Sequence, residues 1–528
     1  NKRLFIIGIL CALLWGYISL MTKGFPQAWV DMLDNYTGHT VSKQIQQMVN
    51  GFHYDTRNNV MPTAAFLTLF YIIFAMVFYL IIAIQKREAQ TGSLLLVVFF
   101  SLVFRVILLF SVPIHENDIY RYMWDGKVFK SEINPYKYSP SDLFMYENKY
   151  KDDFYDGFHE VTLKAKEFEY RDQERLDTLL KLRDQNQTNY ERIGHWQVPT
   201  IYPPMAQLVF LLAAKLKVDH LIFLKGIFIL FDLGVLVLII GILKCLNKNP
   251  CLSLIYGWSP LVLKEFANSG HYDPIVIFFT MFCLYLFLKT NHKRSSLMLA
   301  LAVLSKFFSG VLLPILGRYW SLIHLVIFSF TILLLYVPFF IWNDAGIAGV
   351  FEGLRTYNEQ WSYNSSIFAG IYVLLKQYAP NFTETLWPAK MIVGGIYLFF
   401  LIILVVWKAP QATRINNKFV LNKNQQLIIM HRCFLAVAVL FIINPVGDPW
   451  YFCWVIPFLC IFPYKSWLLL SGLLAFSYIN FQSDYSIVGA RFLDISLTTW
   501  IIYTPFFLYF FIENIFRPSF VLDMKKNM

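Results

Sequence analysis

The sequence has few charged residues and lacks the cysteine patterns of disulfide-stabilised or metal-binding proteins. Only 15% of the 528 residues are charged, and the seven cysteines include no CxxC pair and no histidine partner at metal-ligand spacing. We therefore assign the cysteines neither disulfide nor metal roles. Apolar residues make up 57% of the chain and aromatic residues 18%, more than a soluble protein needs to bury. A large soluble catalytic domain is excluded, and the expected solvent is a lipid bilayer.

Long apolar runs indicate many membrane helices. A helix needs about 20 apolar residues to cross a hydrocarbon layer roughly 30 Å thick, and the chain contains about a dozen candidates. The first run follows Lys2 and Arg3 and lacks a small-residue cleavage site, which favours an anchor over a signal peptide. We predict helices over residues 4–21, 62–84, 94–113, 221–243, 252–263, 275–288, 322–341, 391–407, 429–443, 452–462, 467–481 and 497–516.

Basic residues predict the orientation of these helices. A net charge of +11 would suggest nucleic acid in a soluble protein, but here the charge is concentrated in short loops, so no nucleic-acid partner is expected. The positive-inside rule places the basic segments in the cytoplasm. They are Lys2-Arg3, Lys86-Arg87, Lys244 with Lys248, residues 292–294, residues 408–423 and Lys525-Lys526.

The opposite, non-cytoplasmic side then receives every loop with a polar signature: residues 22–61, 114–201, 265–274, 343–387, 444–450 and 482–496. All six loops can lie on one side only if two segments do not cross the membrane as ordinary helices. They are residues 202–216, and the pair 297–305 and 307–316, which is interrupted at Lys306. Short or broken helices at membrane depth are tolerated where they line a cavity. Four sequons agree with this orientation, although such tripeptides are frequent by chance. They begin at Asn35, Asn186, Asn364 and Asn381.

The densest polar group follows the third predicted helix, in HENDIYRYMWDGKVFKSEINPYKYSP. Helical spacing after Asn117 puts Asp118, Tyr122 and Asp125 on one face, and Glu116 lies just before them. A carboxylate near apolar and aromatic walls is a candidate general base, because burial raises a carboxyl pKa toward the working pH. The alternative is a helix cap with solvated acids beside lipid headgroups.

A second group lies in WSPLVLKEFANSGHYDP, between two predicted helices. Ionisable residues so close to the membrane usually line an aqueous cavity or face one another. Those in this loop are Lys264, Glu265, His271 and Asp273. The alternative is that Asp273 and Pro274 simply start the next helix.

Lys306 is isolated in an apolar stretch, where a lysine is costly unless it meets an anion. The phosphate of a lipid carrier would suit it, and snorkelling to the interface is the alternative. Tyr202, Trp450 and Tyr451 mark Pro-rich helix starts, where aromatic residues either form an interface belt or stack on sugars. The hydrophilic block 141–197 has no nucleophile motif or Gly-rich phosphate loop, and its amphipathic helix is either a membrane lid or solvated.

At these residues the sequence resembles the GT-C superfamily of polytopic glycosyltransferases, and within it mannosyltransferase-like members that use polyprenol- or dolichol-phosphate sugars. Two departures leave the acceptor open: the block between Pro140 and Ile201 is long, and Tyr272 stands where Asn is common. The matching residues follow one another along most of the chain. They are Asp118, Tyr120, Tyr122, Asp125, Gly126, Asn134-Pro135-Tyr136, Tyr202-Pro203-Pro204, Glu265, Gly270, His271, Asp273, Lys306 and Pro449-Trp450-Tyr451.

The resemblance implies an all-α polytopic fold with about 12–14 transmembrane helices, some of them short or broken. Residues 1–528 would form a single multi-pass glycosyltransferase domain, with 114–201 as a large non-cytoplasmic loop. The membrane would be a bacterial inner membrane or, as the alternative, an endomembrane. The active site would face the non-cytoplasmic side.

The implied reaction is an inverting transfer of a sugar, mannose as first guess, from a polyprenyl-phosphate donor to a lipid-linked or surface glycan. Asp118 would take the acceptor proton, and Lys306 with His271 would hold the departing phosphate. No cofactor is required, although Glu116 and Asp118 could bind a divalent cation loosely. The rival function is a transporter or flippase of lipid-linked sugar, but the repeats typical of transporters are not found. The substrate-binding residues would be Glu116, Tyr122, Asp125, Tyr202, Glu265, His271, Asp273, Lys306, Trp450 and Tyr451.

Overall fold

The computed structural model describes a chain built almost entirely of helices. Lys86-Arg87, Lys525-Lys526, the sequons at Asn35 and Asn381, and nearly all of the loop 22–61 lie outside the described residues. The described residues are 2–23, 63–85, 93–148, 154–156, 161–163, 172–216, 221–380, 386–411, 413–415, 418–481 and 490–516.

Six helices in this described part are long and apolar enough to cross a membrane. They are α1 (Lys2–Lys23), α4 (Thr63–Gln85), α12 (Leu221–Cys245), α18 (Leu322–Ile341), α21 (Trp387–Val406) and α22 (Lys423–Ile443). Further helices are α6 (Leu94–Leu109), α11 (Pro204–Lys215), α15 (Asp273–Leu288), α16 (His292–Val303), α20 (Ile367–Tyr378), α25 (Lys465–Leu473) and α26 (Leu497–Phe516). This architecture is consistent with the predicted all-α polytopic membrane protein.

Two predicted helices, 252–263 and 452–462, are wrong as continuous elements. The first is divided into η2 (Pro250–Ser253), α13 (Leu254–Gly257), α14 (Pro260–Val262) and the π-helix η3 (Leu263–Asn268), and the second into α23 (Pro449–Phe452) and α24 (Ile456–Leu459). Proline lacks an N–H and clashes with the preceding turn, so it starts a helix but does not continue one. Four of these short segments carry proline in their first turn: η2, α14, α23 and α24.

The predicted break at Lys306 is confirmed. Lys306 has extended backbone angles, φ −160° and ψ 133°, between α16 and the 3-10 helix η4 (Phe307–Leu312), which α17 (Leu313–Gly317) follows. The predicted helix 467–481 begins as α25 and ends as the 3-10 helix η7 (Leu474–Phe481). Residues 202–216 form only the short α11, which is consistent with the prediction that they do not cross as an ordinary helix.

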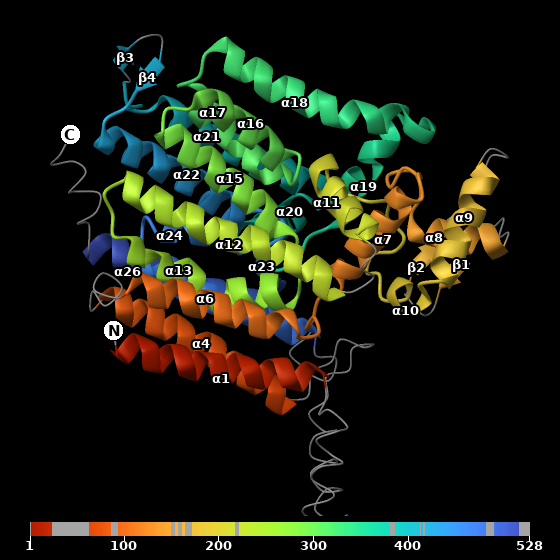
Figure 1. Ribbon diagram of the computed structural model, residues 1–528, viewed down its shortest axis with the longest axis horizontal. Coiled ribbons are helices and arrows are strands. Elements are labelled where there is room, and N and C mark those ends of the chain that lie inside the picture. The colour runs from red at the N-terminus through yellow and green to blue at the C-terminus, as the bar shows by residue number, and fades with distance from the viewer. Residues whose placement is uncertain are drawn as a thin grey trace, which may run out of the picture.

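The hydrophilic segments add short elements, some of which form a separate group in Figure 1. There α7 to α10 and the hairpin β1–β2 project beyond one end of the helix stack. These elements are α7 (Asp118–Lys130), α8 (Pro140–Asn148), β1 (Phe154–Asp156), β2 (Val161–Leu163), α9 (Gln173–Asp184) and α10 (Gln187–Tyr190). The rest are η5 (Trp342–Asp344), α19 (Gly346–Gln360) and two hairpins, β3 (Thr413–Ile415) with β4 (Lys418–Val420) and β5 (Arg491–Phe492) with β6 (Ile495–Ser496).

Three predicted cytoplasmic loops meet at the opposite end of the stack. Lys423 donates to the carbonyl of Cys245, and a ring nitrogen of His292 lies 3.4 Å from the carbonyl oxygen of Phe419. Figure 1 shows the N-terminus and the hairpin β3–β4 at this same end, away from α7 to α10. Among the described residues, the basic loops and the polar-signature loops therefore gather at different ends of the helices.

Close packing fixes α7 against its neighbours. A Cβ at Gly126 would lie 2.4 Å from the carbonyl oxygen of Phe210 in α11, so only glycine allows this approach. The Asn134 side chain donates to the carbonyls of Phe339 and Trp342, both at 2.9 Å, at the end of α18. The turn Asn134-Pro135-Tyr136 therefore holds the segment after α7 against the end of α18.

Candidate active site

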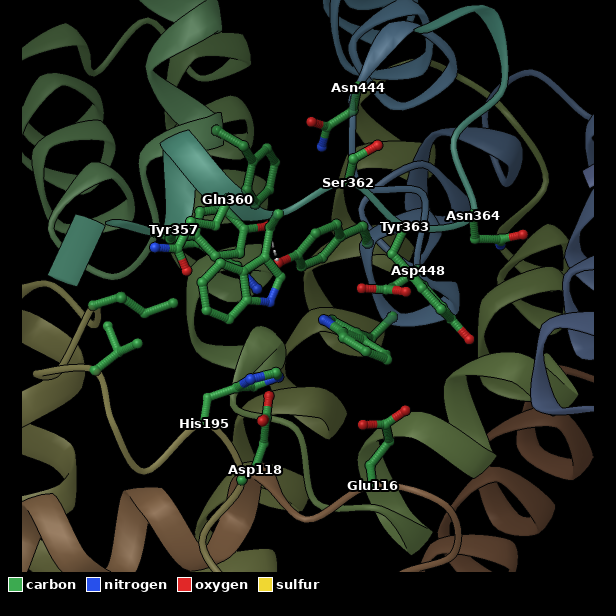
Figure 2. A pocket seen from close by; sticks show the side chains of 18 of the residues that line it. Glu116, Asp118, His195, Tyr357, Gln360, Ser362, Tyr363, Asn364, Asn444 and Asp448 are labelled. Carbon is green, nitrogen blue, oxygen red and sulfur yellow. Dashed lines mark hydrogen bonds between the residues drawn. The ribbon is translucent and has the colours of Figure 1, made fainter. Parts of the chain in front are cut away.

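One large cavity lies at the end of the stack where the polar-signature loops gather. Its volume is about 1310 Å³, and five of the six loops predicted on the non-cytoplasmic side contribute lining residues. Figure 2 shows side chains from the loops 114–201, 343–387 and 444–450 directed toward a common space. Six of the predicted site residues line the cavity: Glu116, Asp118, Tyr202, Lys306, Trp450 and Tyr451.

Asp118 lies in the cavity wall as the first residue of α7. Its side chain is 29% exposed, and its Oδ2 faces Nδ1 of His271 at 3.7 Å. The Tyr122 hydroxyl donates to the same oxygen at 3.3 Å. Asn117 makes no side-chain cap bond to α7. Asp118 therefore has one side open to the cavity and is contacted from behind, unlike a solvated cap residue.

Glu116 and Asp448 form a second acidic part of the wall, and Figure 2 shows both carboxyl groups pointing into the cavity. Burial raises the pKa of each carboxyl well above its ordinary value. The charge of Asp118 adds to both rises, whereas Lys264 opposes the rise for Glu116 and Lys306 opposes it for Asp448. Each group thus holds its proton more readily than a free carboxyl does, and a protonated carboxyl can donate a hydrogen bond to a sugar oxygen.

The anion that pairs with Lys306 is supplied by the protein itself. Its Nζ lies 2.8 Å from Oδ1 of Asp273, and its side chain remains 17% exposed. The indole N–H of Trp454 donates to the same Oδ1 at 2.6 Å. The lysine also lies over the rings of Tyr451 and Tyr272, at 4.4 and 5.0 Å from their centroids. The pair with Asp273 satisfies the lysine within the fold, and Asp273 is also the first residue of α15, as the alternative for this loop predicted.

Glu265 and His271 lie behind the cavity wall and do not line it, contrary to a direct role in binding substrate. Glu265 is completely buried, with both carboxylate oxygens near Nζ of Lys264 at 3.2 and 3.3 Å. His271 is 1% exposed, and its ring stacks on Trp450 with centroids 4.4 Å apart. The loop predicted at 265–274 begins within the π-helix η3, which carries Glu265 and is buried throughout, and His271 follows it.

Asp125 turns away from the cavity, although it lies on α7 with Asp118. Its carboxylate pairs with Arg121 at 2.8 Å and accepts a 2.5 Å hydrogen bond from Thr200. Gln207 of α11 donates to it at 3.3 Å. A buried carboxylate needs such partners, and α7 itself, the segment before α11 and α11 supply them. The predicted role of Asp125 in substrate binding is therefore unsupported by its placement, which is structural.

His195 and Trp454 are among the cavity residues that the sequence did not single out. His195 lines the cavity next to Asp118 in Figure 2, and its ring packs edge-on against Trp361 at 4.8 Å. Burial lowers the pKa of His195, while the charge of Asp118 acts in the opposite direction. The tripeptide Gly194-His195-Trp196, in the otherwise hydrophilic block 141–197, was the available signal. Trp454, which holds Asp273, follows the PWY motif with no distinguishing pattern.

Two sequons are engaged in contacts of the fold. The Asn364 amide donates to the carbonyl of Gly447 at 2.9 Å and is buried in the cavity wall. The Asn186 amide donates to the carbonyl of Leu182 at 2.8 Å. Both nitrogens therefore have protein partners where an attached glycan would need to stand.

The described residues contain no group of three or more His, Cys, Asp or Glu side chains placed to hold a metal ion. The loose divalent site suggested at Glu116 and Asp118 stays a prediction. Comparison with known proteins adds no relative: no family model matches the chain, no curated protein matches it, and no solved structure matches it. Function must be inferred from the residues of the cavity.

Proposed function

We propose that this protein is an integral membrane glycosyltransferase that moves a sugar, mannose as first guess, from a polyprenyl-phosphate donor to a lipid-linked or surface glycan. The observation that carries the proposal is the half-open carboxylate of Asp118 in a cavity that also contains Lys306. A cavity of about 1310 Å³ exceeds the roughly 300–1,000 Å³ of an ordinary small-molecule site. It has room for the reacting ends of two substrates together.

Asp118 is the general base of the proposed reaction. It removes the hydroxyl proton of the acceptor while the acceptor oxygen attacks the anomeric carbon from the face opposite the phosphate, which inverts that carbon. The bond from the anomeric carbon to the phosphate oxygen breaks, and its electron pair leaves with the lipid phosphate. Phosphate is a good leaving group, so stabilisation of its growing charge matters more than a strong acid.

Lys306 is the candidate to stabilise that charge, although Asp273 already neutralises part of its effect. It keeps an exposed portion and lines the cavity, and apolar residues line the same cavity. These apolar residues are Phe307, Phe308, Val311, Leu354 and Leu440. A hydrocarbon chain attached to a phosphate would fit this part of the wall, while Glu116, Asp448 and Trp450 offer hydrogen bonds and a ring face to sugars.

The cavity is proposed to open on the non-cytoplasmic face. Loops that line it are poor in the short basic segments that gather at the other end of the helices, and such basic segments favour the cytoplasm. A bacterial inner membrane is the first choice of location and an endomembrane the second. Prenyl-phosphate donors are amphiphiles, so access from within the bilayer suits this arrangement.

A transfer assay tests the proposal. Purified protein is mixed with a panel of labelled polyprenyl-phosphate sugars and a lipid-linked glycan acceptor, and the product is separated from the donor. The proposal expects labelled acceptor with one donor. The same protein in liposomes with a labelled lipid sugar tests the rival: translocation without transfer from any donor would make it a flippase and overturn the proposal.

A further inference from the structure

His271 occupies a position between two carboxylates of different kinds. Its Nδ1 lies 3.7 Å from Oδ2 of Asp118, and its Nε2 lies 3.3 Å from Oε2 of Glu265. Asp118 is partly open to the cavity, whereas Glu265 is completely buried. Neither ring nitrogen makes a hydrogen bond of good geometry within the described residues. The imidazole is thus the group that connects the candidate base to the interior.

The ring of His271 is held by its surroundings. The stacked indole of Trp450 covers one face, at an interplanar angle of 16°. The backbone N–H of His271 donates to the carbonyl of Glu265 at 3.1 Å. Gly270 precedes it at φ +74°, and a Cβ there would lie 2.5 Å from Ile119. The positive φ favours glycine, and this turn brings the histidine to the start of α7.

Glu265 is fixed on its far side. Lys264 contacts both carboxylate oxygens, and the hydroxyl of Tyr478 donates to Oε1. These partners leave Oε2 directed at the histidine. A neutral imidazole can donate from one nitrogen only, whereas an imidazolium donates from both. Addition of a proton to the ring would therefore satisfy both facing carboxylates.

Charge balance in this group would stabilise an imidazolium once the acceptor proton has reached the ring. Lys264 pairs with Glu265, and two of the cations that line the cavity with Asp118 are paired elsewhere, Arg121 with Asp125 and Lys306 with Asp273. Glu116, Asp448 and His195 also face Asp118 from the cavity side, and none of them contributes a fixed positive charge. A positive ring would compensate the second carboxylate, and unpaired charge in a buried site is expensive.

We propose that His271 is a positioning residue that acts through Asp118 by receiving the acceptor proton from it, with Glu265 orienting the ring and stabilising the imidazolium that forms. The proposal rests on the proposed transfer reaction. The proton passes from the acceptor hydroxyl to Asp118 and then to Nδ1, while Nε2–H stays directed at Glu265. After the product leaves, the proton returns through Asp118 to water, so no co-reactant is consumed.

Kinetics of His271→Gln and Glu265→Gln test the proposal in the purified full-length protein. We expect His271→Gln to lower kcat by about 10²-fold, because a general-base pathway loses its proton acceptor. The donor KM should change less than about threefold, since neither residue lines the cavity. The acid limb of the kcat–pH profile should move to lower pH, because one group that must be unprotonated is gone. Glu265→Gln should move it the same way with a smaller loss of kcat.

His431→Gln is the matched control. This histidine lies in α22, with Nε2 2.9 Å from the Tyr464 hydroxyl, away from the residues that line the cavity. Its replacement should leave the position of the acid limb unchanged. If His271→Gln does not yield a monodisperse protein, Glu265→Gln decides the question by the same shift.

Two results overturn the inference: kcat within about threefold of wild type in His271→Gln, or a lower kcat with the acid limb unmoved, which is the signature of a structural role. The reference variant Asp118→Asn separates this failure from failure of the proposed function. An inactive Asp118→Asn beside a fully active His271→Gln refutes only the proton transfer to histidine. A fully active Asp118→Asn refutes both.

Discussion

Two groups of buried charges in this protein are built in different ways. In the helix stack, Arg105 of α6 meets Asp232 of α12 with contacts of 2.5 and 3.1 Å. A third guanidinium nitrogen donates to the carbonyls of Ser101 and Gly257, and the Tyr256 hydroxyl donates to Asp232 at 2.6 Å. Both side chains of the ion pair are completely buried. The partners in this group are supplied by α6 itself, α12 and α13.

The group at the cavity leaves polar atoms without partners. Within the described residues, Oε1 of Glu116 and Oδ2 of Asp273 are buried and make no hydrogen bond, and neither ring nitrogen of His271 makes one. Natural proteins pair nearly all buried polar atoms, so an exception needs a reason. The contrast teaches that the first group stabilises the fold, while the second keeps capacity for a ligand or a proton.

The largest expected effect is on the first group. Arg105→Met leaves Asp232 charged and buried, which should lower the free energy of unfolding by about 3–5 kcal/mol. Thermal unfolding of purified protein in detergent measures the loss. The double variant Arg105→Met with Asp232→Leu should recover most of it, because no charge remains. A single variant as stable as wild type would mean that the two groups do not differ as described.

Lys306 shares a feature with each group: it is paired with a carboxylate, as Arg105 is, but it also lines the cavity. Lys306→Ala should raise the donor KM about tenfold, a change of about 1.4 kcal/mol, and more than Lys306→Arg does, because either cation offsets part of the phosphate charge. Initial rates at varied donor concentration measure this.

The double variant Lys306→Ala with Asp273→Asn is the control for that measurement. If Lys306 contacts the phosphate, the double variant stays impaired. If the lysine only neutralises Asp273, removal of both charges restores the donor KM, and the assignment of Lys306 to the phosphate is wrong.

The smallest effect concerns Glu116, whose carboxyl pKa is raised by burial. The unfolded chain releases the Glu116 proton above the ordinary carboxyl pKa of about 4.3, whereas the folded protein keeps it to higher pH. The group therefore lowers the free energy of unfolding as pH rises from that value toward the folded pKa. Glu116→Gln removes the penalty. Its melting temperature should exceed that of wild type by a few degrees at pH 8 and by less at pH 5. An equal difference at both pH values would contradict the raised pKa.

The sequence was sufficient for features that depend on local chemistry. The predicted helix 322–341 matches α18, and the charge at Lys306 indicated the break in the helix there. Topology alone indicated that the loops with Asp118 and His271 would converge, and these residues are in contact. Prolines within apolar runs should have indicated the divided segments around Pro260 and Pro457, but hydropathy averages over them.

The sequence was insufficient where partners come from distant segments. Asp125 and Asp118 share a helix and a residue type, yet only Arg121, Thr200 and Gln207 decide that Asp125 is structural. Asp273 begins α15, as the sequence alternative predicted, but its contacts with Lys306 and Trp454 could not be read from the sequence. Spacing along the chain carries no information on such pairings, and the fold supplies it.

The most direct test of the central claim compares turnover and donor binding for Asp118→Asn, Glu116→Gln and Asp273→Asn with wild type. Asparagine keeps the shape of Asp118 but cannot accept the proton, and loss of a general base commonly costs about 10² to 10⁴ in rate. Turnover should therefore fall furthest for Asp118→Asn, with binding of the polyprenyl-phosphate sugar largely retained. If Glu116→Gln or Asp273→Asn is the inactive variant while Asp118→Asn still turns over, the base has been misassigned and the account of the cavity is wrong.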